Sequence, residues 1–149
     1  MKQIPRFSPL RPWAAALCTA LGLVAIAPAQ AADEGELLIE LNKLEDTDEG
    51  CRSLFLFDNG TGHELHRFRV DLILFDQKGV YARQVLLDMA PLYQDKKVVA
   101  SFMLPDQECA SIGSILVNDV PHCENGAGAE LDCVKLLTVR SRSDTPLEK

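Results

Sequence analysis

The sequence predicts an all-β domain, specifically an antiparallel immunoglobulin-like β-sandwich of about seven strands. Apolar residues recur at every second position over most of the chain after residue 31, as in half-buried strands. Turn-forming Gly, Asn, Asp and Pro separate these runs, and no window keeps a helical apolar spacing beyond two turns. Short strands at this spacing are typical of a two-sheet sandwich. A small closed barrel is the alternative architecture.

Residues 1–31 have the pattern of a cleavable signal peptide. Lys2, Arg6 and Arg11 supply its basic start, an uncharged Ala/Leu-rich run covers 13–26, and small residues occupy 29–31. The apolar run is too short for a stable membrane span. We therefore expect a single mature domain, residues 32–149, ordered over about 36–141. It has no membrane span in this interpretation and is periplasmic or secreted.

The clearest strand pattern lies at 66–76, where apolar residues at 68, 70, 72 and 74 alternate with Arg67, Arg69 and Asp71. Turn residues at 58–62 and 76–79 and prolines at 91 and 105 separate the runs. Two other runs, within 51–58 and 112–120, are more continuously apolar, as in central strands. The seven predicted strands are 36–43, 51–58, 66–76, 80–87, 97–104, 112–120 and 132–141.

Four cysteines remain after Cys18 is removed with the signal, and in an exported domain four cysteines predict two disulfides. In the predicted sandwich the second and fifth strands are antiparallel neighbours. Cys51, at the start of the second strand, should then lie beside Cys109, just after the fifth. Cys123 and Cys133 flank the loop between the last two strands. The expected pairs are Cys51–Cys109 and Cys123–Cys133.

The charge of the mature chain excludes one class of partner. All 22 acidic residues and 12 of the 15 basic residues follow residue 31, so the mature formal net charge is −10. Such a chain lacks the clustered positive charge that a phosphate backbone requires. We expect no nucleic-acid partner.

Three groups of segments, spread over about 36–139, carry a family resemblance. They are ELNKLE (40–45) with GCR (50–52) and FDN (57–59), DLILFD (71–76) with GV (79–80) and AR (82–83), and IG (112–113) with LVNDV (116–120) and Cys123. Together they resemble small bacterial exported proteins called Tat-pathway-signal-sequence domain proteins. The resemblance implies an exported location and a fold, but it implies no chemical activity. Arg6 and Arg11 are not adjacent, so Sec export fits the signal as well as the Tat route.

The functional prediction is a non-enzymatic interaction or accessory module that needs no cofactor. Its expected partner is another envelope protein. Arg67 and Arg69 share one face of a predicted strand, and Arg52 and Arg83 lie on strands expected to be neighbours. These four arginines form the predicted partner face. The alternative is a set of cross-strand ion pairs, each of which contributes little to stability.

Two other functions are alternatives. The first is a metal-binding or metal-delivery protein that uses His63, His66 and His122, because imidazoles are common ligands of transition metals. The second is a small hydrolase with an unrecognised site. No G-x-S-x-G motif occurs, and the nearest serines, Ser111 and Ser114, lie within or beside a predicted strand.

Overall fold

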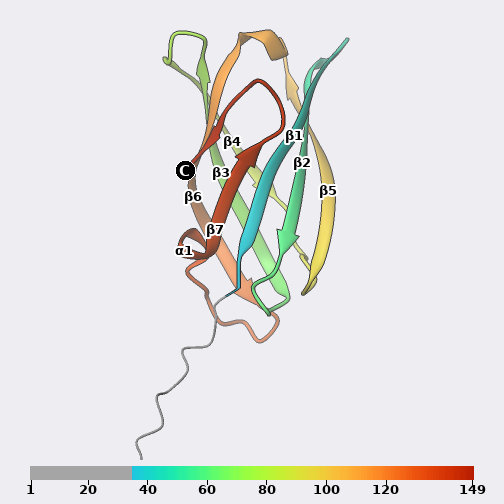
Figure 1. Ribbon diagram of the computed structural model, residues 1–149, viewed down its shortest axis with the longest axis vertical. Coiled ribbons are helices and arrows are strands. Elements are labelled where there is room, and N and C mark those ends of the chain that lie inside the picture. The colour runs from blue at the N-terminus through green and yellow to red at the C-terminus, as the bar shows by residue number, and fades with distance from the viewer. Residues whose placement is uncertain (1–34) are drawn as a thin grey trace, which may run out of the picture. The chain divides into compact units, whose positions relative to one another are not determined.

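Two four-stranded β-sheets face each other in the computed structural model, which describes residues 35–149 (Figure 1). The expected signal peptide, residues 1–31, lies outside the described residues. The prediction of an all-β domain is confirmed. No helix among the described residues is long and apolar enough to cross a membrane.

Eight strands, one 3-10 turn and one short helix make up this part of the chain. In order they are β1 (Leu37–Thr47), β2 (Gly50–Asn59), β3 (Leu65–Asp76), β4 (Tyr81–Asp88), β5 (Lys96–Pro105), η1 (Cys109–Ser111), β6 (Ile112–Asn125), α1 (Cys133–Leu136), β7 (Leu137–Ser141) and β8 (Leu147–Glu148). Sheet A has the order β5-β2-β1-β7, and sheet B has the order β4-β3-β6-β8.

Both sheets are mixed, so the prediction of a wholly antiparallel sandwich is wrong. Strand β1 pairs with β7 in parallel, and β6 pairs with β8 in parallel. Successive strands run in alternate directions along the sandwich (Figure 1). Two odd-numbered or two even-numbered neighbours must therefore be parallel. The order of the strands in each sheet decides which neighbours are parallel, and the local alternation of side chains does not encode that order.

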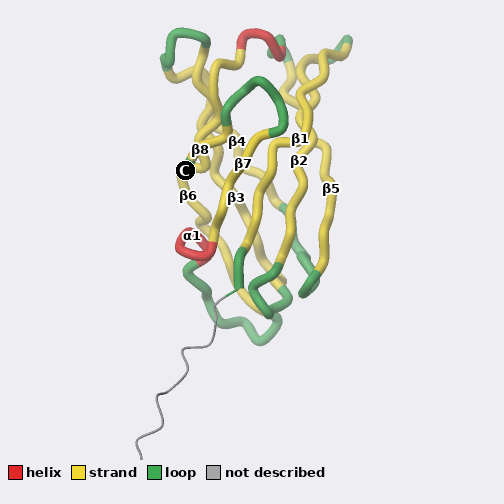
Figure 2. The backbone as a smooth tube through the Cα atoms, in the orientation of Figure 1, coloured by secondary structure: helices red, strands yellow, loops and turns green. Residues whose placement is uncertain are grey.

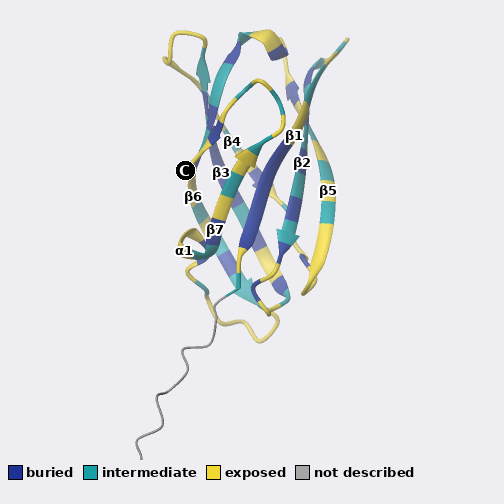
Figure 3. Cartoon of the chain, viewed as in Figure 1, coloured by how far each residue is buried: buried dark blue, intermediate teal, exposed yellow. Residues whose placement is uncertain are grey.

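The core lies between the sheets and consists of the inward-facing residues of each strand. Strand β2 alternates buried and half-buried residues along its whole length (Figure 3). Three fully buried phenylalanines lie near the centre, and the rings of Phe57 and Phe68 join the two sheets edge to face, with centroids 6.2 Å apart. Offset aromatic pairs of this kind add stability beyond their buried area.

Two predicted elements near the C-terminus differ from the structure (Figure 2). The predicted strand 132–141 begins with helix α1, because Asp132 accepts a hydrogen bond from the Lys135 amide and caps a helical turn. The ordered region does not end near 141. Strand β8 follows, and Leu147 is buried against the core.

Each of the two disulfides links a strand to a short helical element that follows it in the chain. Cys51 on β2 is bonded to Cys109 in η1, and Cys123 on β6 is bonded to Cys133 in α1. These are the pairs that the strand order favours. The first closes a loop of 58 residues, for which a chain-entropy treatment gives about 4 kcal/mol of stabilisation.

Candidate functional site

The outer face of sheet B is built by the residues of β3 that point away from the core. Phe68, Val70, Leu72 and Leu74 are buried between the sheets, so the residues between them face outward. From one end of the strand to the other, these outward residues are Arg67, Arg69, Asp71, Ile73 and Phe75. The outer face therefore has a charged half, an apolar half, and Asp71 between them.

Asp71 is the unusual member of this face because its side chain points outward yet the residue is only 6% exposed. Gln84 on β4 donates its amide to Asp71 Oδ1 at 2.8 Å, and Asn118 on β6 donates its amide to Asp71 Oδ2 at 2.8 Å. Each carboxylate oxygen thus has its own donor on a different neighbouring strand. The three side chains connect all three long strands of sheet B.

The pairing of β3 with β6 is irregular on both sides of Asp71. The register shifts between Arg69 and Asp71 and again between Asp71 and Leu72. Bulges of this kind change the direction of side chains and are frequent beside functional sites. Here the register shifts lie beside the position where the Asn118 amide donates to Asp71.

In the charged half, arginines pair with acids across the strands. Arg69 donates to Asp88 Oδ2 at 2.8 Å, and Arg67 donates to Glu124 Oε1 at 2.5 Å. The hydrogen bond from Arg69 lowers the pKa of Asp88, against the smaller opposite effect of burial. His122 lies opposite Arg69 in the β3–β6 register. This half therefore combines both signs of charge with an imidazole.

The apolar half lies at the other end of the same face. Leu86 pairs with Asp71 in the β3–β4 register and is 56% exposed. Tyr81, which pairs with Phe75, is also exposed, while Ile73 and Leu116 are half-buried. Aromatic side chains such as Tyr81 and arginines such as Arg69 are enriched in protein–protein interfaces.

The four arginines predicted as a partner face do not share one surface. Arg67 and Arg69 do, but Arg52 lies on β2 in sheet A, where it pairs with Glu45 at 2.7 Å. Arg83 lies opposite Leu74 of the core, and its Nη1 donates to the Pro105 carbonyl oxygen of sheet A at 3.0 Å. Arg52 was misplaced because alternation does not say which sheet a strand joins, and Arg83 because its register on β4, beside β3 as expected, places it opposite the core residue Leu74.

The three histidines are not gathered into one site. His66 and His122 line a small cleft of about 130 Å³ together with Arg69 and Asp88. His63 lies apart in the loop before β3, and its carbonyl oxygen accepts a hydrogen bond from Asn59. Within residues 35–149, no group of three or more His, Cys, Asp or Glu side chains is arranged to bind a metal ion.

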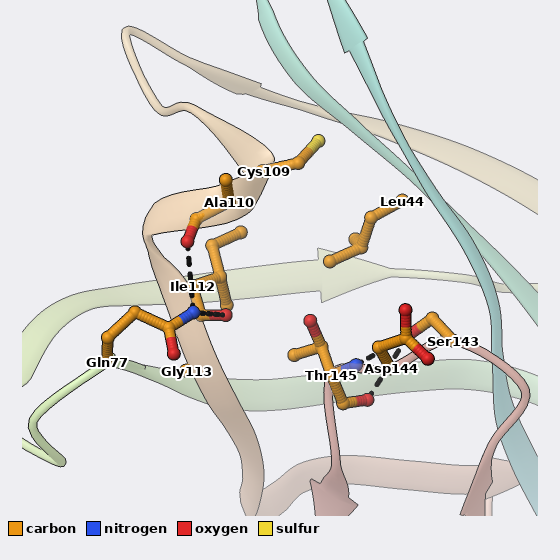
Figure 4. Close-up of a pocket in the computed structure, with 9 residues that line it drawn as sticks. All are labelled: Leu44, Gln77, Cys109, Ala110, Ile112, Gly113, Ser143, Asp144 and Thr145. Atoms are coloured by element: carbon orange, nitrogen blue, oxygen red, sulfur yellow. Dashed lines mark hydrogen bonds between the residues drawn. The ribbon is translucent and has the colours of Figure 1, made fainter.

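A second cavity, of about 370 Å³, opens at the end of the sandwich that carries the β1–β2 turn and η1. Figure 4 shows Gln77 beside it, with the side-chain amide donating to the carbonyl oxygens of Ala110 and Ile112. Ser143 and Thr145 hydrogen-bond to each other within their own turn. The Gln77 amide, the Ser143 hydroxyl and the Thr145 backbone are therefore occupied by the protein itself.

Ser111, one of the two serines considered for a hydrolase, is engaged by its own loop. The Ser111 hydroxyl donates to the Glu108 carbonyl oxygen at 2.6 Å and hydrogen-bonds to the Gln107 amide. A nucleophilic serine needs a base within hydrogen-bonding reach. The partners of Ser111 are a carbonyl and an amide, neither of which is such a base.

The Asp71–Gln84–Asn118 network was not predicted from the sequence. The signal was present, since all three residues lie at outward positions of predicted strands. Assembling them, however, requires knowing that β4 and β6 flank β3 and in which register. The fold and this surface define a disulfide-linked β-sandwich domain. No family model matches the chain, and no curated protein or solved structure matches it.

Proposed function

We propose that this protein is an exported, non-enzymatic interaction module of immunoglobulin-like type, acting in the periplasm or outside the cell. Its partner-binding surface is the outer face of sheet B. The partner is another envelope protein. The export half of the proposal rests on the signal-like residues 1–31 and on the two disulfides, which persist in oxidising compartments.

The observation that carries the binding half is the buried Asp71 carboxylate on an outward face. Its two amide partners join β4, β3 and β6 and so reduce the freedom of the strands that present the surrounding side chains. A surface that is rigid before binding loses less entropy when a partner docks. Arg69 on one side and Leu86 and Tyr81 on the other then supply charged and apolar contacts.

Site-specific cross-linking in the cell envelope tests this proposal. A photoreactive phenylalanine derivative in place of Tyr81, which is 60% exposed, leaves the Asp71 network intact and should produce a defined cross-linked product. Leu86→Lys in the same chain should strongly reduce that product, because a charge would enter the apolar half. Val134→Lys is the matched control, since Val134 is an exposed apolar residue on α1. Equal product with Leu86→Lys and with the unchanged chain would remove this face from the proposal.

A further inference from the structure

Strand β5 borders sheet A and carries protective residues only at its two ends, Lys96 and Lys97 at the start and Pro105 as the last residue. Its pairing with β2 is continuous from Gly50–Pro105 to Asn59–Lys96, with no register shift. The seven residues 98–104, Val-Val-Ala-Ser-Phe-Met-Leu, contain no charge, proline or glycine. Edge strands normally carry such a residue or a bulge to prevent pairing with another chain. A regular, uncharged edge of this length can therefore accept a further strand.

The other edge strands of the described sandwich are protected. Strand β7 is five residues long and includes Arg140, and β8 has two residues. Strand β4 has a register shift at its start, between Leu74 and Phe75 of its partner, and carries Arg83, which lies opposite Leu74 and reaches across to Pro105. Inward-pointing charges and bulges are both known protections.

Apolar surface remains uncovered on both faces of β5 (Figure 3). On the outer face Val99 is 62% exposed and Met103 is 38% exposed. On the inner face Val98, Ala100 and Phe102 pack against the core but are only partly buried. A strand added beside β5 would cover both rows, and burial of apolar area favours association.

We propose that a second copy of this chain supplies that strand, by antiparallel pairing of β5 with β5 about a two-fold axis at Ser101. In this register Val99 lies opposite Met103 and Ala100 opposite Phe102, so a smaller side chain always meets a larger one. Opposite residues lie on the same face of an antiparallel pair. The apolar rows of the two copies therefore meet on each face.

Charge selects the same register. Lys96 at the start of β5 then lies near Asp106, the turn residue (φ 58°) that directly follows the strand in the other copy. Both residues are exposed, and neither takes part in an ion pair within the described part of the chain. A shift that centred the axis on Ala100 would place Lys96 opposite Leu104. One that centred it on Phe102 would place Asp106 opposite Val98.

The two-fold arrangement closes on itself, because each copy uses the one edge of the described sandwich that is regular and uncharged along its central residues. Two A sheets become one continuous eight-stranded sheet, with the outer face of each sheet B left free. The dimer interface is therefore separate from the proposed partner-binding face, and each can fail independently in experiments.

Sedimentation velocity over a range of concentrations tests the dimer, using the protein purified after export. We expect a monomer–dimer equilibrium. Val99→Lys should raise the dissociation constant more than about tenfold, because it puts a charge in the apolar row of the interface. The matched control is Leu86→Lys, a similarly exposed position on the other long edge strand, which should leave the equilibrium unchanged while reducing cross-linking to the partner.

A charge swap tests the register itself. Lys96→Glu should weaken the dimer by opposing Asp106, and adding Asp106→Lys in the same chain should restore it. Circular dichroism and thermal unfolding establish that each variant folds. A purely monomeric protein at all accessible concentrations would overturn the proposal. Equal effects of Val99→Lys and Leu86→Lys, or a charge swap without rescue, would also overturn it.

Discussion

The outer faces of the two sheets each contain a nearly buried carboxylate, but its partners differ. Glu40 on β1 is 3% exposed and meets Arg140 Nε at 2.7 Å and Arg142 Nε at 3.2 Å. Asp71 in sheet B meets two neutral amides. The first carboxylate is compensated by two arginines together with the Asn42 amide, and the second by neutral amides alone. One domain thus uses two different sets of partners to offset the cost of burying a carboxylate on an outward face.

The difference matters because the two kinds of partner adapt differently. A guanidinium can only donate hydrogen bonds, whereas a side-chain amide can turn over and accept one instead. The Glu40 cluster therefore requires a negative charge, while the Asp71 network can be rebuilt around a neutral group. Glu40 on β1 also binds Arg140 of β7 and Arg142, which follows β7. Its replacement should therefore weaken the attachment of β7 to sheet A.

The largest effect is expected for Glu40→Gln. The new amide has one acceptor left for two arginines and the Asn42 amide, and its NH₂ group faces donors. We expect a loss of about 1–2 kcal/mol in the free energy of unfolding, since both arginines can partly return to water. Urea denaturation at neutral pH measures it. Glu45→Gln, at an exposed ion pair with Arg52, should cause no measurable loss. An equal loss in both variants would contradict this account of Glu40.

The second-largest expected effect is that the stability difference between the unchanged protein and Glu40→Gln depends on pH. Burial alone would raise the pKa of Glu40, but the Asn42 hydrogen bond and the two arginines outweigh it and lower the pKa below its usual value of 4.5. A lowered folded-state pKa means that the stabilisation is present above about pH 4.5 and is lost as the pH falls through the folded value. The gap between the unchanged protein and Glu40→Gln should therefore close with acidification. A gap that stayed constant to pH 3 would show that it does not arise from ionisation.

The smallest effect is expected for Asp71→Asn. Gln84 or Asn118 can turn its amide to accept from the new NH₂ group, so all three side chains keep partners. We expect a change within about 0.5 kcal/mol, measured by the same denaturation experiment. Asp71→Val, which removes both acceptors, should be clearly less stable than Asp71→Asn. If the two variants were equally destabilised, the charge of Asp71 rather than its hydrogen bonds would be the important property.

Most strands could be predicted from local patterns, because a strand with one buried face must alternate. Strand β3 shows this best: its predicted bounds, 66–76, differ by one residue from Leu65–Asp76. Helix α1 was missed, since four residues capped by Asp132 are too short to show a helical period. Strand β8 was missed because Leu147 is a single apolar residue in a polar segment, buried only once the sandwich forms.

The surface residues were predicted less well than the strands that carry them. Arg67 and Arg69 share a face because they lie two positions apart on one strand, which is a local fact. Arg52 was misplaced because its position depends on which strands are neighbours, and Arg83 because its position depends on the register of β4 against β3. The Asp71 network depends in addition on register shifts that no single strand reveals.

The amino-acid sequence by itself determined most of the strands, the alternation of side chains within each regular strand, and the cysteines available for pairing. Side-chain alternation follows from backbone geometry within one segment, so it can be read locally. Only the tertiary structure decided the parallel neighbours β1–β7 and β6–β8, the amides beside Asp71, and the position of β5 at the edge of sheet A. These depend on which segments meet across the whole chain, and that is settled by packing two sheets around one core.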